Sequence, residues 1–340
     1  MCCLFFSACE PPQFAAVAGD VYPEEYDDFI SNLSFINLDI GVMLSYSCLV
    51  STDFYDRLLL NTIAPLVVLM LLAGSYSVAK KRNQGSEAAM CQVQRKHVSA
   101  GLFVAFLVYS SVSFTIFQTF VCEPLDDGMS YLRADYNLTC DSNRYTIYKA
   151  YAILMVCVYP IGLPVILAWW LLRNRVDLKK ANRTANQHLE SFSGIWGPYR
   201  PSRYYYEVVE SGRRIALTAT ASFVPPDSVA QIAVVLLVAA VFLFISESLS
   251  PFSSSVDMAL YRWGNGIILA SMYVGLLLKV DTSNEETSAL SAFGAVLIAA
   301  NVFLVVAVLV QSVLMVFKWK GVANSARMGR PADARRVPQP

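Results

Sequence analysis

Two cysteines enclose the stretch of the sequence whose chemistry is easiest to predict. Cys122 and Cys140 lie within residues 121–146, which read VCEPLDDGMSYLRADYNLTCDSNRYT and are rich in acidic side chains. If this stretch lies outside the cell or in a lumen, a disulfide between the two cysteines would stabilise it by about 3 kcal/mol in the chain-entropy model. We predict this bridge, and the alternative is a pair of reduced thiols.

Two glycosylation sequons lie in acidic parts of the chain. Asn137-Leu138-Thr139 falls between the two cysteines, and Asn32-Leu33-Ser34 lies nearer the N-terminus. Both match the acceptor pattern of secreted and surface loops. We therefore predict glycosylation at Asn137 and Asn32, with chance occurrence of each sequon as the alternative.

A proline-glycine run interrupts an apolar segment. Residues 159–164 read YPIGLP, so Pro160, Gly162 and Pro164 lie close together. Proline has no N–H, so the carbonyls of Val156 and Pro160 lose their helical donors. We expect the helix to bend here, either as a hinge for gating or as a static kink satisfied by neighbouring groups.

Charged residues enter another apolar segment. Glu210 precedes Arg213 and Arg214 by three and four positions, so the three side chains can share one helix face. We interpret them as an anchor at the membrane interface, with arginines that reach outward to the headgroups. A voltage sensor needs arginines that recur through the span, and residues 215–226 contain none.

A few other polar residues lie within apolar segments. We predict an intramembrane ion pair between Glu247 and Arg262, because an unpaired charge at depth is expensive. Asn265 and Asn301 could line a polar path, or they could hydrogen-bond between helices as packing contacts.

Signatures of enzymes and cofactor sites are absent from the sequence. The chain contains no HExxH, GxSxG, P-loop or glycine-rich nucleotide motif, and only two histidines. None of its eight cysteines forms a CxxC pair, which argues against a zinc site. The formal net charge of zero gives no indication of nucleic-acid binding. We therefore expect a protein that is not an enzyme and that has no cofactor.

The composition predicts the structural elements that hold these residues. The chain of 340 residues is 56% hydrophobic and only 15% charged, whereas soluble domains carry about 25% charged residues. The apolar residues gather in runs long enough to cross about 30 Å of hydrocarbon as helices. Seven runs are strong: 57–79, 98–120, 147–172, 208–226, 228–248, 259–280 and 288–317. We predict an all-α, polytopic transmembrane helix bundle.

Charge along the chain predicts its orientation. Lys and Arg concentrate in the connectors 80–97 and 173–206 and in the C-terminal tail, which should be cytoplasmic. The alternate regions are acidic, so seven spans place the N-terminus outside. Three domains follow: an acidic outer segment over 1–56, the bundle over 57–320, and a disordered basic tail over 321–340. Within the first, residues 29–50 form either an interfacial helix or an eighth span.

The outer connectors are too short for a re-entrant pore loop of the tetrameric cation-channel kind. Such a loop needs a half-helix of about 10 residues and a return segment. Residues 225–228 and 281–287 cannot hold both. We expect any conduction path to run between helices or through an assembly of chains.

Several segments together resemble a known family. In chain order they are FINLDI, SYSCL, a span with Pro65, TFVCEPLDDGMSYLRADYNLTC, VYPIGLP, LLRNR, YRPSRYYYEVVESGRR and SLSPF. This pattern, over roughly residues 30–280, resembles the TRP-like (transient receptor potential C-terminal-type) transmembrane module of protist, algal and oomycete membrane proteins. Many of those proteins carry ephrin-receptor-like cysteine-rich repeats, which this sequence lacks, and no selectivity-filter sequence is visible.

The resemblance implies a multi-pass protein of the plasma membrane or an endomembrane that acts as an ion channel or a transport-related membrane sensor. Its expected partners are the lipid bilayer and either further copies of itself or other membrane subunits. A seven-helix receptor is one alternative, although Asp-Arg-Tyr and Asn-Pro-x-x-Tyr motifs are missing at the expected places. A non-conducting accessory or scaffold subunit is the other.

Overall fold

The structure is a computed structural model that describes most of the central part of the chain. The described residues are 53–83, 87–126, 128–180, 187–225 and 228–280, with isolated helical positions 299, 302, 303, 306, 307 and 310. Several predictions lie outside them: the sequon at Asn32, the segment 29–50, Asn301, most of the run 288–317, and the tail 321–340.

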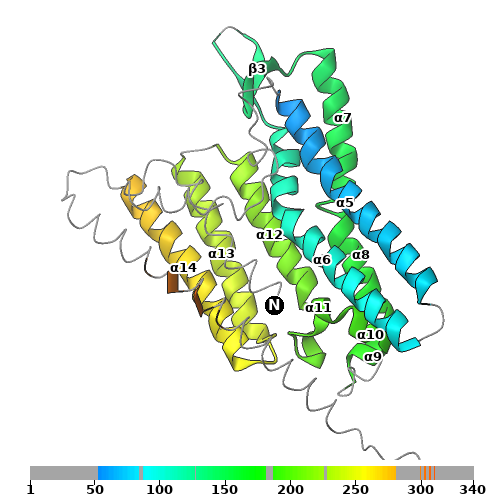
Figure 1. Cartoon of the computed structure of the whole chain (residues 1–340). Helices are drawn as coiled ribbons and strands as arrows, with labels where there is room; N and C mark the ends of the chain where they lie inside the picture. The colour runs from blue at the N-terminus through cyan, green and yellow to red at the C-terminus, as the bar shows by residue number, and fades with distance from the viewer. Residues whose placement is uncertain are drawn as a thin grey trace, which may run out of the picture.

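Long helices make up most of the described structure (Figure 1). They are α5 (Phe54–Arg82), α6 (Glu87–Gln118), α7 (Asn143–Val158), α8 (Gly162–Arg173), α12 (Tyr206–Phe223), α13 (Val229–Leu249) and α14 (Ser255–Val280). In Figure 1 they run roughly along one another as a bundle, which is the architecture that the apolar runs predicted.

Four helical segments are long and apolar enough to cross a membrane, counted among the described residues. They are Phe54–Arg82, Ala89–Gln118, Asn143–Arg173 and Val229–Leu249. The lengths and composition of these segments are those of the helices of a membrane protein. Two further predicted spans, 208–226 and 259–280, are helical as α12 and α14 but do not meet the same criterion.

Local sequence signals explain where several helices begin and end. Ser142 and Ser228 precede α7 and α13, and each side chain accepts a hydrogen bond from a first-turn backbone N–H, that of Tyr145 or Gln231. Such caps satisfy a donor that the helix leaves free. α5 ends in Lys80, Lys81 and Arg82, whose charges favour the negative end of the helix dipole.

Short elements gather at one end of the bundle, which we call the connector end (Figure 1). They are α9 (Arg175–Leu178), α10 (Gln187–Ser191), α11 (Ser193–Trp196) and the 3-10 turn η5 (Pro201–Arg203). An ion pair of 2.5 Å between Arg95 and Glu190 joins α10 to the first half of α6. A backbone bridge between Tyr199 and Phe252 joins this region to the turn before α14.

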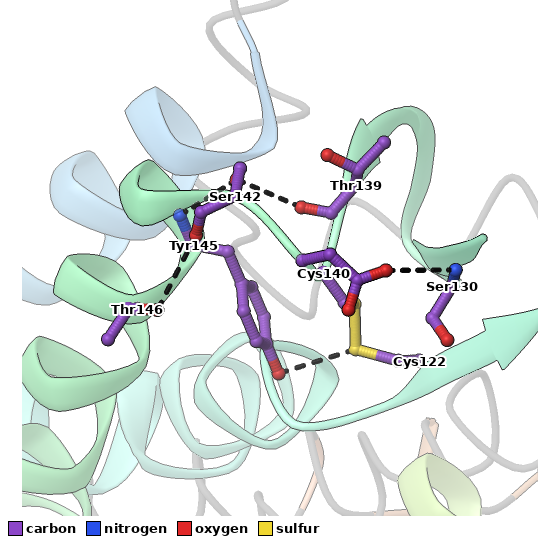
Figure 2. Close-up of a disulfide and its surroundings, with 8 residues drawn as sticks. Cys122, Ser130, Thr139, Cys140, Ser142, Tyr145 and Thr146 are labelled. Carbon is purple, nitrogen blue, oxygen red and sulfur yellow. Dashed lines mark hydrogen bonds between the residues drawn. A yellow bond between two sulfur atoms is a disulfide. The ribbon is translucent and has the colours of Figure 1, made fainter.

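A small antiparallel sheet covers the opposite end, and we call residues 121–142 the cap. Its strands are β1 (Cys122–Pro124), β2 (Ser130–Leu132) and β3 (Asp135–Thr139), in the order β1-β2-β3. The predicted disulfide between Cys122 and Cys140 is present (Figure 2). Leu132 is completely buried in an apolar cluster formed with residues of α5, α6 and α7. The cap is therefore packed onto the helices.

Candidate functional site: a buried charge cluster on α12

Four charged side chains are buried on the first half of α12. They are Glu207, Glu210, Arg213 and Arg214, and none exposes more than 3% of its surface. We call these four residues the charge cluster. Its two carboxylates and two guanidinium groups balance in charge when all are ionised.

Glu210 is the centre of the charge cluster. The guanidinium of Arg213 donates from Nε to both oxygens of Glu210 at 3.1 Å and from Nη2 to Oε1 at 2.5 Å. The Nε atom of Arg214 lies 3.6 Å from the same Oε1. The three- and four-residue spacings place all three groups on one helix face, as the sequence predicted.

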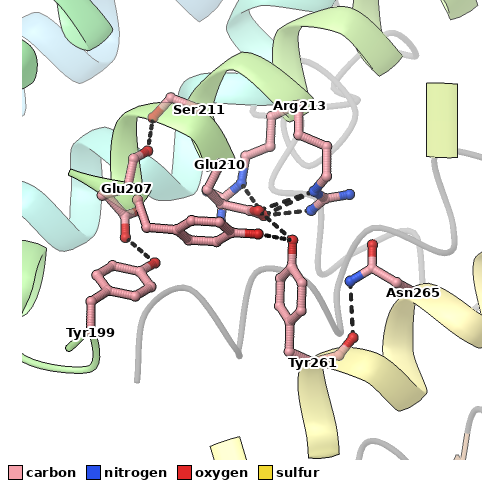
Figure 3. A network of polar contacts seen from close by, with 9 residues as sticks. Tyr199, Glu207, Glu210, Ser211, Arg213, Tyr261 and Asn265 are labelled. Carbon is pink, nitrogen blue, oxygen red and sulfur yellow. Dashed lines mark hydrogen bonds and ion pairs between the residues drawn. The ribbon is translucent and has the colours of Figure 1, made fainter. Parts of the chain in front are cut away.

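Tyrosines from other segments complete the hydrogen bonds of the carboxylates (Figure 3). The hydroxyl of Tyr199 donates to Glu207 at 2.8 Å. The hydroxyl of Tyr261, on α14, donates to Oε2 of Glu210, also at 2.8 Å. The hydroxyls of Tyr206 and Tyr261 are 3.4 Å apart. The charge cluster therefore joins α12 to α14 and to the connector end through aromatic hydroxyl groups.

The position of the arginines corrects the sequence interpretation. An interface anchor requires Arg213 and Arg214 to reach outward to headgroups, but their side chains are 1% and 2% exposed. Neighbouring helices cover them, because α12 packs between α6, α8 and α13. Sequence reasoning also missed Glu207, Tyr199 and Tyr261. The only available signal was the spacing from Glu207 to Glu210 and Arg213, which repeats every three residues on one face.

The predicted ion pair of Glu247 and Arg262 is present but lies on the surface of the described bundle. Arg262 donates from Nε and Nη2 to the two oxygens of Glu247, at 2.6 and 2.7 Å. The side chain of Arg262 is 56% exposed and that of Glu247 is 39% exposed. Asn265 is buried and donates to the backbone carbonyl of Tyr261 in its own helix, at 2.9 Å. That bond is a packing contact, and Asn301, the other residue of the predicted polar path, lies outside the described residues.

The helix break over residues 159–161 separates α7 from α8 at the YPIGLP run. α7 ends at Val158 and α8 begins at Gly162. A Cβ atom at Gly162 would lie 2.7 Å from the carbonyl oxygen of Cys157. Glycine is therefore required by a close backbone approach, which the sequence pattern did not indicate.

Both carbonyls that lose a helical donor at the helix break find another. The N–H of Ile161 donates to the carbonyl of Val156 at 3.1 Å. The hydroxyl of Tyr109, on α6, donates to the carbonyl of Pro160 at 3.2 Å. Tyr159 in turn donates to the carbonyl of Thr62, on α5, at 2.7 Å. Hydrogen bonds from α6 and to α5 thus fix the helix break, and its free carbonyls are satisfied, as in a static kink.

The cap also reaches the charged helix. The guanidinium of Arg133 donates to the carbonyl of Ser222, in the last turn of α12. Asn137, the predicted glycosylation site, is exposed on β3, and its amide donates to Asp135 at 3.0 Å. Nearby, Tyr136 donates to Glu123, and this hydrogen bond raises the pKa of the tyrosine hydroxyl.

Within the described residues, no group of three or more His, Cys, Asp and Glu side chains is placed to hold a metal ion. Comparison with known proteins finds no matching family model, curated protein or solved structure. The functional argument therefore rests on the charge cluster itself.

Proposed function

We propose that this chain is a multi-pass membrane protein of the TRP-like type that conducts ions or senses the state of the membrane. The observation that carries this proposal is the burial of Glu207, Glu210, Arg213 and Arg214 on one helix of an apolar bundle. Ionisable groups at membrane depth are expensive, and where they occur they usually mark ion pathways or voltage- and proton-sensitive elements.

The arrangement of the charge cluster supports a role in movement between helices. Glu210 has a close partner in Arg213 and a second arginine, Arg214, at 3.6 Å. It also accepts a hydrogen bond from Tyr261 of α14. Because Arg213 and Arg214 share α12 with Glu210, a small shift of α12 against α14 would break the Tyr261 hydrogen bond while both arginines stay within reach. A change between two such arrangements is the usual basis of a conformational switch.

Seven spans with the N-terminus outside form part of the proposal. The helix α5 ends at the connector end with Lys80, Lys81 and Arg82, and α9 places Arg175 and Lys179 there. The acidic cap lies at the opposite end (Figure 1). The positive-inside rule then makes the connector end cytoplasmic and the cap external. An epitope tag after Pro340 should be accessible only after permeabilisation, and access in intact cells would contradict this topology.

Reconstitution in liposomes tests the function. Purified full-length protein should support ion flux, and Glu210→Gln should change the rate at least tenfold because Arg213 loses its carboxylate partner. Asp177→Asn is the matched control, since it removes a carboxylate from the exposed pair with Lys180. Flux that Glu210→Gln leaves unchanged would remove the charge cluster from the mechanism. A lack of flux under every ion gradient and membrane potential would favour a receptor or an accessory subunit instead.

A further inference from the structure

A groove lies between α5 and α6, away from the charge cluster. It has a volume of about 240 Å³ and is lined by residues that include Leu69, Leu72, Tyr76, Gln94, His97 and Gly101. It is located in the half of the two helices that approaches the connector end, since α5 ends at Arg82 and α6 begins at Glu87. We call it the α5–α6 groove.

The α5–α6 groove is apolar at one end and polar at the other. Leu69 and Gly101 lie deeper along their helices, whereas Tyr76 and Gln94 lie nearer the connector end. The structure gives the Tyr76 hydroxyl and the Gln94 amide no hydrogen-bond partner among the described residues. His97 uses Nδ1 for the carbonyl of Val93, at 2.8 Å, and its ring lies 5.7 Å from that of Tyr76. The polar end therefore has groups available for a ligand.

Basic residues continue the polar end toward the connectors. Lys80 is one helical turn beyond Tyr76 on the same face of α5, and Lys81 and Arg82 follow it. The side chains of Lys80 and Lys96 are exposed. An apolar slot that opens onto hydrogen-bond donors and then onto ammonium groups matches a molecule with an acyl chain, a polar glycerol region and a negative charge.

We propose that the α5–α6 groove binds one anionic phospholipid. An acyl chain lies against Leu69, Leu72 and Gly101, the ester and phosphate oxygens accept hydrogen bonds from Tyr76 and Gln94, and Lys80 pairs with the negative charge of the headgroup. A sterol would use the hydroxyl and amide groups but would gain nothing from the lysine, so the charge favours a phosphate-containing lipid. The site requires only that α5 and α6 lie in a bilayer. Its failure would leave the proposed function untouched.

Gly101 allows the groove to be filled without altering its charge. A Cβ atom at Gly101 would meet only the Leu69 side chain, at the ordinary contact distance of 3.8 Å. Gly101→Ala should therefore be tolerated, whereas Gly101→Phe should occupy the slot. The full-length protein would be purified, delipidated and titrated with dioleoyl-phosphatidylglycerol or dioleoyl-phosphatidylcholine, and bound lipid would be counted by native mass spectrometry.

We expect the wild-type protein and Gly101→Ala to retain one phosphatidylglycerol at least tenfold more tightly than phosphatidylcholine. Gly101→Phe should lose this tight site, although every basic residue remains. Equal retention by Gly101→Phe and the wild type would overturn the proposal, because the basic surface alone would then explain binding. Preferential retention of cholesterol over phosphatidylglycerol would also overturn it.

Substitutions at the polar end of the groove test the same site independently if Gly101→Phe does not fold. Lys80→Gln combined with Gln94→Leu should abolish the preference for phosphatidylglycerol while leaving weak binding of phosphatidylcholine. The control is Lys180→Gln, which removes an exposed lysine two residues after the end of α9 that is paired with Asp177. A preference that survives the double change, or that falls equally in the control, would contradict the proposed site.

Discussion

The charge cluster and the helix break both place polar groups inside an apolar bundle, but with different chemistry. At the break, the groups that need partners are neutral backbone carbonyls, and an N–H and a hydroxyl satisfy them. On α12 the groups are carboxylates and guanidinium ions, of which Glu210 and Arg213 hydrogen-bond to each other while tyrosines donate to both carboxylates. The comparison shows that one bundle can satisfy some of its buried polar groups with neutral hydrogen bonds and others with ion pairs.

The two solutions differ in how they respond to change. A neutral hydrogen bond contributes about 0.5–1.5 kcal/mol net, so the helix break can lose one contact and persist. Removal of one member of a buried ion pair costs about 3–5 kcal/mol, because the remaining charge keeps its desolvation cost. The charge cluster should therefore be the more sensitive region, and the predictions below test this difference.

The largest effect is expected at the centre of the charge cluster. Glu210→Gln should lower the free energy of unfolding by about 3–5 kcal/mol, because it removes the carboxylate that Arg213 and Arg214 share. Reversible unfolding in detergent, followed by circular dichroism, measures this. A loss below about 1 kcal/mol would mean that the buried charges do not depend on one another.

A matched pair of tyrosines compares the two regions directly. Tyr261→Phe removes a hydrogen bond to a carboxylate, and Tyr109→Phe removes one to the carbonyl of Pro160. Bonds to charged groups contribute about 1.5–3 kcal/mol and neutral ones about 1 kcal/mol. Tyr261→Phe should therefore destabilise the protein more in the same unfolding measurement. A larger loss of stability in Tyr109→Phe than in Tyr261→Phe would contradict the expected difference between the two regions.

Gly162 tests whether the helix break is fixed by sterics. Gly162→Ala would place Cβ 2.7 Å from a backbone oxygen, and the local rearrangement should cost about 1–3 kcal/mol. Gly74→Ala is the control, since no atom lies within 4 Å of its added Cβ, and alanine is the better helix former by about 1 kcal/mol. Equal melting temperatures for the two variants would show that the break can relax freely.

The smallest effect is expected for the exposed pair of Glu247 and Arg262. Glu247→Gln should change the free energy of unfolding by at most about 1 kcal/mol, because exposed ion pairs contribute little. High salt should reduce even this contribution in aqueous detergent solution. A loss as large as that of Glu210→Gln would mean that this pair is buried in the membrane-embedded protein.

Local patterns along the chain predicted a large part of this molecule. Runs of apolar residues predicted helices, and four of them are long and apolar enough to cross a membrane. The acidic loop between Cys122 and Cys140 predicted a bridge that is present. The spacing of Glu210 and Arg213 predicted a shared helix face. Each of these features depends on residues that are close in sequence, or on composition over one helix length.

Other features depended on contacts between distant segments. Sequence reasoning placed Arg213 at the membrane interface, because it could not show that α6, α8 and α13 would cover this helix. It also could not assign Tyr261 to Glu210 or Tyr109 to Pro160, because 51 positions separate the members of each pair. The need for glycine at position 162 is a local effect by contrast, because the close atom is the carbonyl oxygen of Cys157, five residues earlier.

The sequence by itself determined that this chain forms apolar helices, because capping residues and proline act within one or two helical turns and hydropathy acts over one helix length. Tertiary structure alone decided which polar groups are buried and which partners they have. Burial depends on the faces that neighbouring helices cover, and those faces meet only after the chain has packed. For this reason the charge of Glu210 is visible in the sequence, whereas its role as the centre of a buried cluster is visible only in the fold.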